Sequence, residues 1–321
     1  MSRILVIGGG GMVGQKLAQR IAGGALGDAA SHDVTLFDMA FPDKSAPGQQ
    51  MRGTLTDASI LKRLAAHRYD TVFHLAAIVS GEAEIDYDKG WSVNMMSMWQ
   101  LLEALREEHT LSDGEYRPRV VFTSSIAVFG GPYPEKISDT FLSAPQTSYG
   151  AQKAASELML SDASRKGYVD GLSLRLPTIC VRPGKANLAA SSFFSGIIRE
   201  PLNGQEALLP VPDTVRHWHA SPRSAAGFLT HAATLDTNLL EGRRALNLPG
   251  LSCTVAEQIE ALRKVSGEDV VRLIKSEPDE NIMRIVGGWP RNFYPERAIA
   301  LGFQAESSFE DIIRVYIADD L

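Results

Sequence analysis

The sequence predicts an α/β fold: a doubly wound parallel sheet followed by a smaller mixed region. Three observations predict it. Strand-like and helix-like segments alternate from residue 3 to about residue 182, and a glycine-rich turn separates the first strand from the first helix. After residue 182 the segments become shorter and richer in proline. Because alternating β and α units build a parallel sheet covered by helices on both faces, the alternation indicates this class of fold.

Apolar periodicity places each element. Short apolar runs predict strands at 3–9, 33–39, 70–79, 119–125 and 171–181. A helical apolar period predicts helices at 12–22, 59–69 and 93–109, and a fourth that begins near residue 149. In the later region, helices are expected at 254–267 and 308–319. One strand near 244–249 is expected to return to the main sheet.

Charge and composition exclude several classes of function. The chain of 321 residues carries a net charge of −6 and has no basic stripe, so we expect neither nucleic-acid binding nor a membrane-surface role. No apolar run approaches the roughly 18–20 residues that cross a bilayer. The N-terminus leads directly into the first strand without a targeting segment. Cys180 and Cys253 lie far apart and outside metal-ligand spacing. A cytoplasmic protein without a metal site is expected.

The turn after the first strand, "VIGGGGMVG", has the spacing of a phosphate-binding loop. It fits G-x-x-G-x-x-G through Gly8, Gly11 and Gly14, and G-x-G-x-x-G when Gly9 takes the first place. Glycines there allow a pyrophosphate to approach the backbone, and the helix that follows offers free N–H groups to the anion. A glycine turn without a ligand is the alternative.

An acidic residue, Asp38, ends the second strand, somewhat further from the glycine loop than is usual. A carboxylate at this place accepts both ribose hydroxyls of adenosine and repels a 2′-phosphate. No arginine or lysine follows at once. NAD is therefore expected in preference to NADP, with a simple turn residue as the alternative for Asp38.

These signals divide the chain into two regions. We expect a Rossmann-type NAD-binding domain at 1–182 and a substrate-binding region at 183–321. The boundary is not clean, because the strand near 244–249 belongs to the first region.

Further motifs follow in a fixed order. "GTLTD" ends in Asp57, "HLAA" spans 74–77, "TSSIAVFG" contains Ser125, and Tyr149 and Lys153 stand four positions apart. Together with the glycine loop, they resemble the extended short-chain dehydrogenase/reductase (NAD-dependent epimerase/dehydratase-like) family over almost the whole chain. The resemblance implies these cofactor contacts: Gly8, Gly11, Met12, Val13, Gly14, Asp38, Asp57, Leu75, Ala76, Ala77, Tyr149, Lys153 and Pro177.

The Tyr-x-x-x-Lys spacing puts Tyr149 and Lys153 on one helical face, where two ordinary neighbours are the alternative. Hydride leaves an alcohol carbon only if the hydroxyl proton leaves too. A free tyrosine has a pKa of about 10, and a lysine ammonium with a positive nicotinamide ring is expected to lower that pKa. The resemblance makes Tyr149 the base, and Ser125 the group that orients the reacting oxygen. The resemblance also implies that Asn94 binds a water molecule that links Lys153 to solvent.

Two departures from the family pattern bear on the substrate. Thr178 stands where nucleotide-sugar enzymes carry an asparagine, three residues after Arg175. Ile126 and Ala127 stand where dehydratases carry an acidic pair. A sugar-nucleotide dehydratase is therefore not expected, and a sugar-nucleotide epimerase is disfavoured.

Basic residues occupy the stretches that should form the substrate cleft at the carboxyl ends of the strands. They are Arg182, Lys185, Arg216, His217, His219 and Arg223. Because arginine binds carboxylates with two parallel hydrogen bonds, we expect a small carboxylate substrate. Its expected contacts are Ser125, Tyr149, Thr178, Arg182 and Arg216. Salt bridges to nearby acids are the alternative for each arginine. The two histidines have no third metal ligand nearby, so no metal is expected.

Three stretches, at 175–202, 220–233 and 297–317, resemble a branch of the family. The resemblance implies oxidation of the C2 hydroxyl of a four-carbon sugar acid with NAD. Two other functions stay open: a nucleotide-sugar 4-epimerase with the same Tyr/Ser/Lys set, and a non-catalytic dinucleotide-binding sensor. Helix 93–109 is apolar on two sides, through Met95, Met98, Trp99 and Leu102 on one and Val93, Met96, Leu101 and Ala104 on the other. The sheet covers only one side, so a homodimer is expected.

Overall fold

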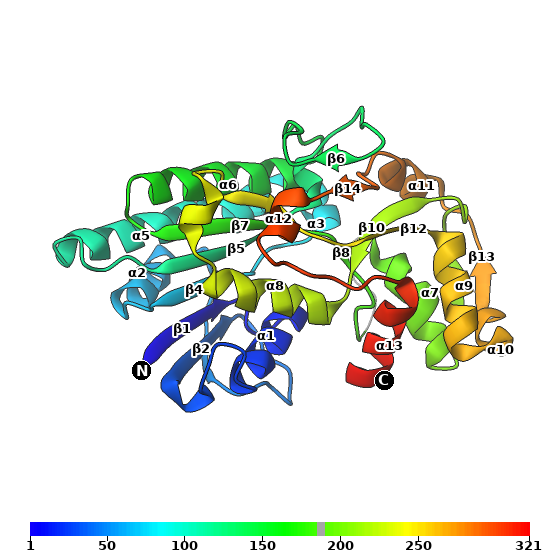
Figure 1. Ribbon diagram of the computed structural model, residues 1–321, viewed down its shortest axis with the longest axis horizontal. Helices are drawn as coiled ribbons and strands as arrows, with labels where there is room; N and C mark the ends of the chain where they lie inside the picture. Colours follow the sequence, from blue (N-terminus) through cyan, green and yellow to red (C-terminus); the bar gives the residue numbers. More distant parts are fainter. Residues whose placement is uncertain (185–189) are drawn as a thin grey trace.

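A seven-stranded parallel sheet forms the centre of the protein, in the order β11-β7-β5-β4-β1-β2-β3 (Figure 1). The computed structural model describes residues 1–184 and 190–321, so Lys185 lies outside the described residues. The strands of this sheet are β1 (Ser2–Ile7), β2 (His32–Asp38), β3 (Gln49–Arg52), β4 (Thr71–His74), β5 (Arg119–Ser125), β7 (Asp170–Leu176) and β11 (Ala245–Asn247). The predicted fold class is confirmed.

Helices cover both faces of the sheet. They are α1 (Met12–Ala22) and α8 (Pro222–Thr234) on one face, and α2 (Ala58–Ala66), α5 (Ser97–Leu111) and α6 (Ser148–Arg165) on the other. Within β1, Ile4 and Val6 pack into the α1/α8 core, whereas Leu5 and Ile7 pack into the α2/α5/α6 core. A strand buried on both faces has no solvated side, which is why "ILVI" is apolar without interruption.

The strand order reverses between β1 and β4. From β1 the chain adds β2 and β3 on one side, and from β4 it adds β5, β7 and β11 on the other. Connections that leave in opposite directions open a crevice at the carboxyl ends of these two strands. The glycine loop follows β1 and the "HLAA" segment follows β4, so both line this crevice.

The rest of the chain forms smaller mixed sheets and short helices beside this crevice. The strands are β8 (Thr178–Ile179), β10 (Arg216–Ala220) and β12 (Leu251–Thr254) in one sheet, β9 (Ala207–Leu209) with β13 (Ile274–Ser276), and β6 (Ile137–Ser138) with β14 (Phe293–Tyr294). The longer helices are α7 (Ser192–Leu202), α9 (Val255–Ser266) and α13 (Phe309–Asp319). The shorter ones are η1 (Ala29–Ser31), α3 (Ser80–Ile85), α4 (Tyr87–Trp91), η2 (Ser92–Met96), η3 (Ile126–Val128), η4 (Thr237–Leu240), α10 (Glu268–Val271), α11 (Glu280–Gly287) and α12 (Glu296–Ala300).

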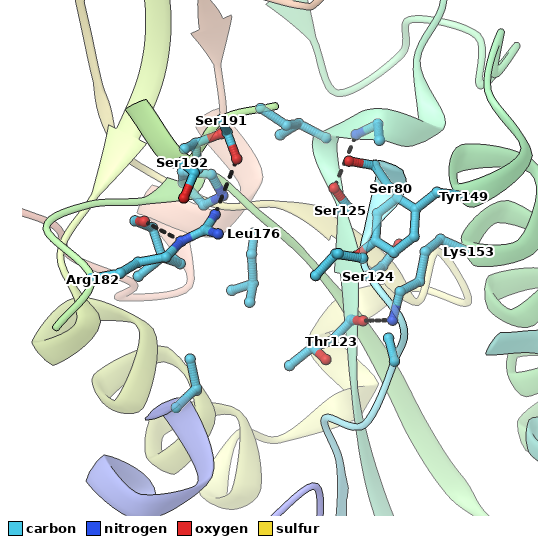
Figure 2. A pocket seen from close by; sticks show the side chains of 18 of the residues that line it. Ser80, Thr123, Ser124, Ser125, Tyr149, Lys153, Leu176, Arg182, Ser191 and Ser192 are labelled. Atoms are coloured by element: carbon cyan, nitrogen blue, oxygen red, sulfur yellow. Dashed lines mark hydrogen bonds between the residues drawn. The ribbon is translucent and has the colours of Figure 1, made fainter. Parts of the chain in front are cut away.

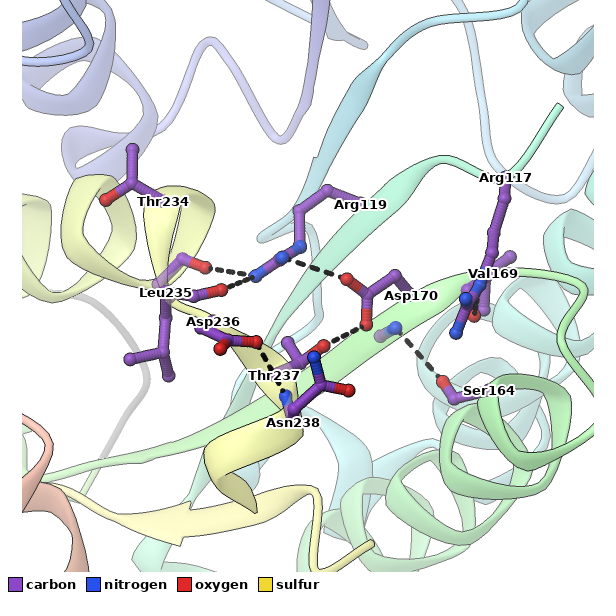
Figure 3. Close-up of polar contacts among 12 residues, drawn as sticks. Arg117, Arg119, Ser164, Val169, Asp170, Thr234, Leu235, Asp236, Thr237 and Asn238 are labelled. Atoms are coloured by element: carbon purple, nitrogen blue, oxygen red, sulfur yellow. Dashed lines mark hydrogen bonds and ion pairs between the residues drawn. The ribbon is translucent and has the colours of Figure 1, made fainter. Parts of the chain in front are cut away.

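A polar cluster fastens the later region to the amino ends of β5 and β7 (Figure 3). The Arg119 guanidinium donates to the carbonyls of Ala232 and Leu235 at the end of α8, both at 2.9 Å, and pairs with Asp170 at 2.8 Å. Asp170 also accepts hydrogen bonds from Thr237 at 2.6 Å and Arg244 at 2.9 Å. Because Arg119 lies on β5 while Thr237 and Arg244 come from segments after residue 230, Asp170 joins the two regions of the chain.

The helix expected at 93–109 differs from the prediction. It is divided into α4, a π-helical turn at η2 and α5. Met98, Leu101, Leu102 and Ala104 are all buried within the chain, because α2 and α6 pack around α5. Met96 and Trp99 stay 42% and 46% exposed. The predicted second apolar side is therefore much smaller than the periodicity suggested. None of the helices in the described ranges is long and apolar enough to span a membrane.

Candidate active site

A cavity of about 440 Å³ lies at the carboxyl ends of the central strands. It extends from the glycine loop past Ser125, Tyr149 and Lys153 to Arg182 and His217. Figure 2 shows Tyr149 and Ser125 on one wall and Arg182 with Ser191 on the facing wall. The cavity therefore joins the expected cofactor loop, the expected catalytic pair and one of the expected arginines.

The glycine loop forms a cradle that side chains would fill. Gly8 has a φ of +88°, and a Cβ there would lie 2.7 Å from the Ala76 nitrogen. A Cβ on Gly14 would lie 2.2 Å from the Gly8 carbonyl oxygen. Helix α1 starts after Gly11 without any side-chain cap, so its first N–H groups are left for a ligand. The loop therefore fits a dinucleotide pyrophosphate.

Most of the expected cofactor residues line this cavity. They are Gly8, Gly11, Met12, Val13, Gly14, Leu75, Ala77, Tyr149, Lys153 and Pro177. Asp38, Asp57 and Ala76 do not line it. The Asp38 carboxylate accepts the Gly10 N–H at 2.9 Å and so stays beside the loop. Asp57 caps α2, where its carboxylate accepts the Ser59 N–H at 2.9 Å.

Helix α6 presents Tyr149 and Lys153 to the cavity. It begins at Ser148, because the Thr147 hydroxyl accepts the Gly150 N–H at 3.1 Å and caps the helix. The Lys153 ammonium donates to the Thr123 carbonyl at 2.8 Å and lies 5.6 Å from the centre of the Tyr149 ring. Ser125, at the end of β5, hydrogen-bonds to the Tyr149 hydroxyl.

Burial shifts the pKa values of this pair in the direction opposite to the expectation. It raises the pKa of Tyr149 to about 12, against the charge of Arg182 and the hydrogen bond from Ser125. It lowers the pKa of Lys153 to about 7, against the charge of Glu157. In the protein alone the desolvation of Tyr149 outweighs the Arg182 charge and the Ser125 hydrogen bond, so these groups by themselves do not bring Tyr149 towards the phenolate.

Asn94 does not reach Lys153. Its side-chain oxygen accepts the Ile78 N–H at 2.9 Å, and its amide donates to the Gln152 side chain at 2.7 Å. Its carbonyl accepts the Ser156 hydroxyl at 3.1 Å. Because Ile78 lines the cavity and Gln152 precedes Lys153, Asn94 holds a wall segment against α6. These contacts indicate a positioning role for Asn94, and the expected water between Asn94 and Lys153 stays a prediction.

Arg182 is the expected arginine that lies in the cavity. Its Nε donates to the Ile179 carbonyl at 2.9 Å and its Nη2 to the Ser191 hydroxyl at 3.3 Å. Among residues 1–184 and 190–321 it forms no ion pair with a carboxylate. Arg199 also lines the cavity, and it donates to the Arg182 carbonyl at 2.8 Å while it pairs with Glu200.

Two other expected arginines, Arg216 and Arg223, lie outside the cavity. Arg216 is outside the cavity, where it donates to the Ser252 carbonyl at 3.0 Å and pairs with Glu257 at 3.2 Å. Arg223 pairs with Asp319 near the C-terminus. The ion-pair alternative therefore describes both arginines. Among residues 1–184 and 190–321, the expected convergence of the two basic stretches occurs through Arg182 and His217.

Thr178 and His217 line the cavity together, with the Thr178 Oγ1 atom 2.6 Å from His217 Nε2. His219 is fully buried behind them, 3.0 Å from the Gln258 side chain. No group of three or more possible metal ligands occurs within the described residues.

Several lining residues were not expected from the sequence. They are Ser80, Ser191, Ser192, Arg199, Trp289 and Pro290. None of them was expected as a site residue. Trp289 comes from a loop far away in sequence, and its ring centre lies 5.2 Å from that of His217. Only the fold reveals them.

A family model described as the NAD dependent epimerase/dehydratase family matches residues 4–220. The chain belongs to this family. Two curated family relatives named D-erythronate dehydrogenase are similar over almost their full length. The protein from Cupriavidus necator is 46% identical over 98% of both chains. The one from Haemophilus influenzae is 40% identical over 99% of this chain and 100% of its own.

A crystal structure of the nucleoside-diphosphate-sugar epimerase from Agrobacterium tumefaciens has the same fold, with a TM-score of 0.94. It is 54% identical to this chain and the match covers 99% of this chain and 94% of that one. The relatives of this epimerase/dehydratase family member thus include both dehydrogenases and a named epimerase. The side chains that line the cavity distinguish a dehydrogenase from an epimerase.

Proposed function

We propose that this chain is an NAD-dependent dehydrogenase that oxidises the C2 hydroxyl of a small sugar acid, with D-erythronate as the substrate. One observation carries the proposal. The Arg182 guanidinium, without an ion-pair partner among the described residues, faces Ser125 and Tyr149 across a single cavity. A carboxylate bound to Arg182 would leave the neighbouring carbinol within reach of the catalytic wall. The two relatives named D-erythronate dehydrogenase support the same substrate.

The charges of the cavity fit a substrate with one negative charge. Of the two arginines that line it, Arg199 already pairs with Glu200 at 2.5 Å. Among the arginines of the described residues that line the cavity, Arg182 then remains to balance an incoming anion. One unpaired guanidinium matches one carboxylate, which it can bind with two parallel hydrogen bonds. A nucleotide sugar would bring a diphosphate with two charges. The small sugar acid is therefore favoured over the nucleotide sugar.

The cavity wall that carries Ser125 and Tyr149 would then remove the proton of the C2 hydroxyl. Tyr149 takes the proton of the C2 hydroxyl, and Ser125 hydrogen-bonds to the same oxygen and orients it. Bound NAD would supply the acceptor for the C2 hydride, and its positive ring would favour the Tyr149 phenolate. Lys153 has a pKa of about 7, so it can gain or lose a proton near neutral pH and pass on the proton that Tyr149 receives. Arg182 holds the carboxylate, so that C2 stays in place during the transfer.

The proposed cofactor is NAD in preference to NADP. The glycine cradle and the uncapped start of α1 would hold the pyrophosphate. Asp38, held by the Gly10 N–H, would accept the ribose hydroxyls and repel a 2′-phosphate. Asp57 caps α2, so its contact with the adenine stays a proposal that rests on the family resemblance.

We also propose a homodimer, on a smaller surface than the sequence suggested. Met96 at the end of η2, Trp99 in the first turn of α5 and Leu158 on α6 are exposed. Large exposed apolar side chains on these helices favour a second copy of the chain as their cover.

The decisive experiment measures NADH formation with three- to six-carbon sugar acids and NAD. D-erythronate is expected to give the highest kcat/KM, and purified Tyr149→Phe protein serves as the matched control for contaminating activity. An epimerase would hold NAD tightly, give no net NADH and convert a UDP-hexose. Such a result would replace the proposed function with the epimerase alternative.

A further inference from the structure

Thr178 and His217 form a hydrogen-bonded pair in the wall of the cavity. Thr178 lies on β8 and His217 on the neighbouring strand β10, and their Oγ1 and Nε2 atoms are 2.6 Å apart. The imidazole ring stacks on Phe194 at 5.2 Å with an angle of 5°, and Trp289 packs 5.2 Å from it. The ring is 2% exposed. This packing holds the ring against the threonine hydroxyl.

The protonation of the ring determines what Thr178 can offer a substrate. Burial lowers the pKa of His217 to about 3, so the ring is neutral near neutral pH and carries one N–H. The Pro290 carbonyl favours a proton on this ring, and Nδ1, which has no hydrogen-bond partner among the described residues, is the nitrogen that is free to carry it. With the proton on Nδ1, Nε2 can only accept. The Thr178 hydroxyl must then donate to Nε2, and its oxygen keeps its lone pairs for the cavity.

We propose that Thr178, with its proton committed to His217, accepts a hydrogen bond from a non-reacting hydroxyl of the substrate and so selects hydroxylated acids over deoxy acids. The inference rests on the proposed function, because it assumes that a small sugar acid occupies the cavity. A hydroxyl is the donor that such an acid carries away from C2. Carboxylate oxygens would be repelled by the lone pairs of Thr178, so the carboxylate stays with Arg182.

The experiment compares kcat/KM for D-erythronate with that for its 3-deoxy and 4-deoxy analogues. Wild-type protein is expected to prefer D-erythronate to one analogue by roughly 2- to 12-fold, the range of one neutral hydrogen bond. Thr178→Val should abolish that preference by slowing the parent acid, and Thr178→Ser should keep it. Thr110→Val is the matched control, because the exposed Thr110 hydroxyl donates to the Arg106 carbonyl within α5 and does not line the cavity.

Two results would overturn the inference: equal use of all three acids by the wild type, or full preference in Thr178→Val. If the wild type makes no NADH from any of the acids, the proposed function fails and this inference fails with it. These results differ, so the two failures are distinguishable.

His217 is a positioning residue in this scheme, and a separate pair of variants tests it. His217→Phe keeps an aromatic ring against Phe194 but removes the Nε2 acceptor. The Thr178 hydroxyl is then free to donate elsewhere, and the preference for the hydroxylated acid should fall. His217→Gln offers a carbonyl that can accept the same proton and should restore the preference. If His217 had only a structural role, both variants would have a lower Tm and a kcat/KM reduced equally for all three acids. Should either variant fail to fold, the comparison of Thr178→Val with Thr178→Ser still decides.

Discussion

Replacing Arg182 with methionine removes the cation that is proposed to hold the substrate carboxylate. The side chain keeps a similar length and an apolar stem, so the cavity wall keeps its bulk. The guanidinium bonds to the Ile179 carbonyl and the Ser191 hydroxyl are lost. Arg182→Lys keeps the charge without the planar fork, and it should lie between the wild type and the methionine variant.

The magnitude follows from the one unpaired charge. A hydrogen bond to a charged group contributes about 1.5–3 kcal/mol, so its loss should raise KM for D-erythronate roughly 10- to 150-fold. Because Arg182 also keeps C2 in place for Tyr149, kcat should fall as well. Steady-state NADH formation at several substrate concentrations separates the two effects.

Two controls make the result specific. Arg216→Met removes an arginine of the same size whose ion pair with Glu257 lies outside the cavity at 36% and 54% side-chain exposure. Exposed pairs contribute about 0–1 kcal/mol, and this variant should leave KM within about twofold. The amide of D-erythronate, which lacks the charge, should react poorly with the wild type and lose little more with Arg182→Met. Equal rates for acid and amide in the wild type would refute the reasoning, and so would equal effects of the two arginine variants.

Four further predictions concern other parts of the molecule. Tyr149→Phe should lower kcat at least ~100-fold and leave the Kd of NAD, measured by fluorescence titration, nearly unchanged; turnover within about tenfold of the wild type would mean that Tyr149 is not the base. Asp38→Ala should narrow the ratio of kcat/KM values for NAD and NADP, and a wild type that uses NADP equally well would contradict the proposed cofactor. Asp170→Asn should lower the free energy of unfolding, measured in urea at neutral pH, by about 2 kcal/mol. Burial raises the pKa of Asp170, but the hydrogen bonds from Thr237 and Arg244 outweigh it and hold this pKa below 3.8. The stabilisation is therefore present above pH 3.8 and is lost as the pH falls through the lowered pKa. A difference that persists at low pH would speak against this explanation. Trp99→Glu should shift the protein from dimer to monomer in light scattering, and a wild type that is monomeric at micromolar concentration would refute the dimer.

Local sequence determined the sheet and the position of the cofactor loop. A strand such as β1 that is buried on both faces must be apolar at successive positions. Its own residues therefore predict the strand, whichever segments pack against it. Gly8 and Gly14 are readable for a similar reason, because backbone at the loop comes too close for a Cβ. The four-residue spacing of Tyr149 and Lys153 is one helical turn, which is also a local property.

Only the tertiary structure decided which of these side chains face the cavity and how they ionise. Arg182 and Arg216 look alike in sequence, yet one lines the cavity and the other pairs with Glu257, because β10 turns Arg216 away. The pKa of Tyr149 rises because the surrounding chain removes its water. Burial and ion pairing depend on residues far away in sequence, such as Trp289 beside His217. A local pattern specifies the type and spacing of side chains, whereas the packing of distant segments fixes their solvent and their partners.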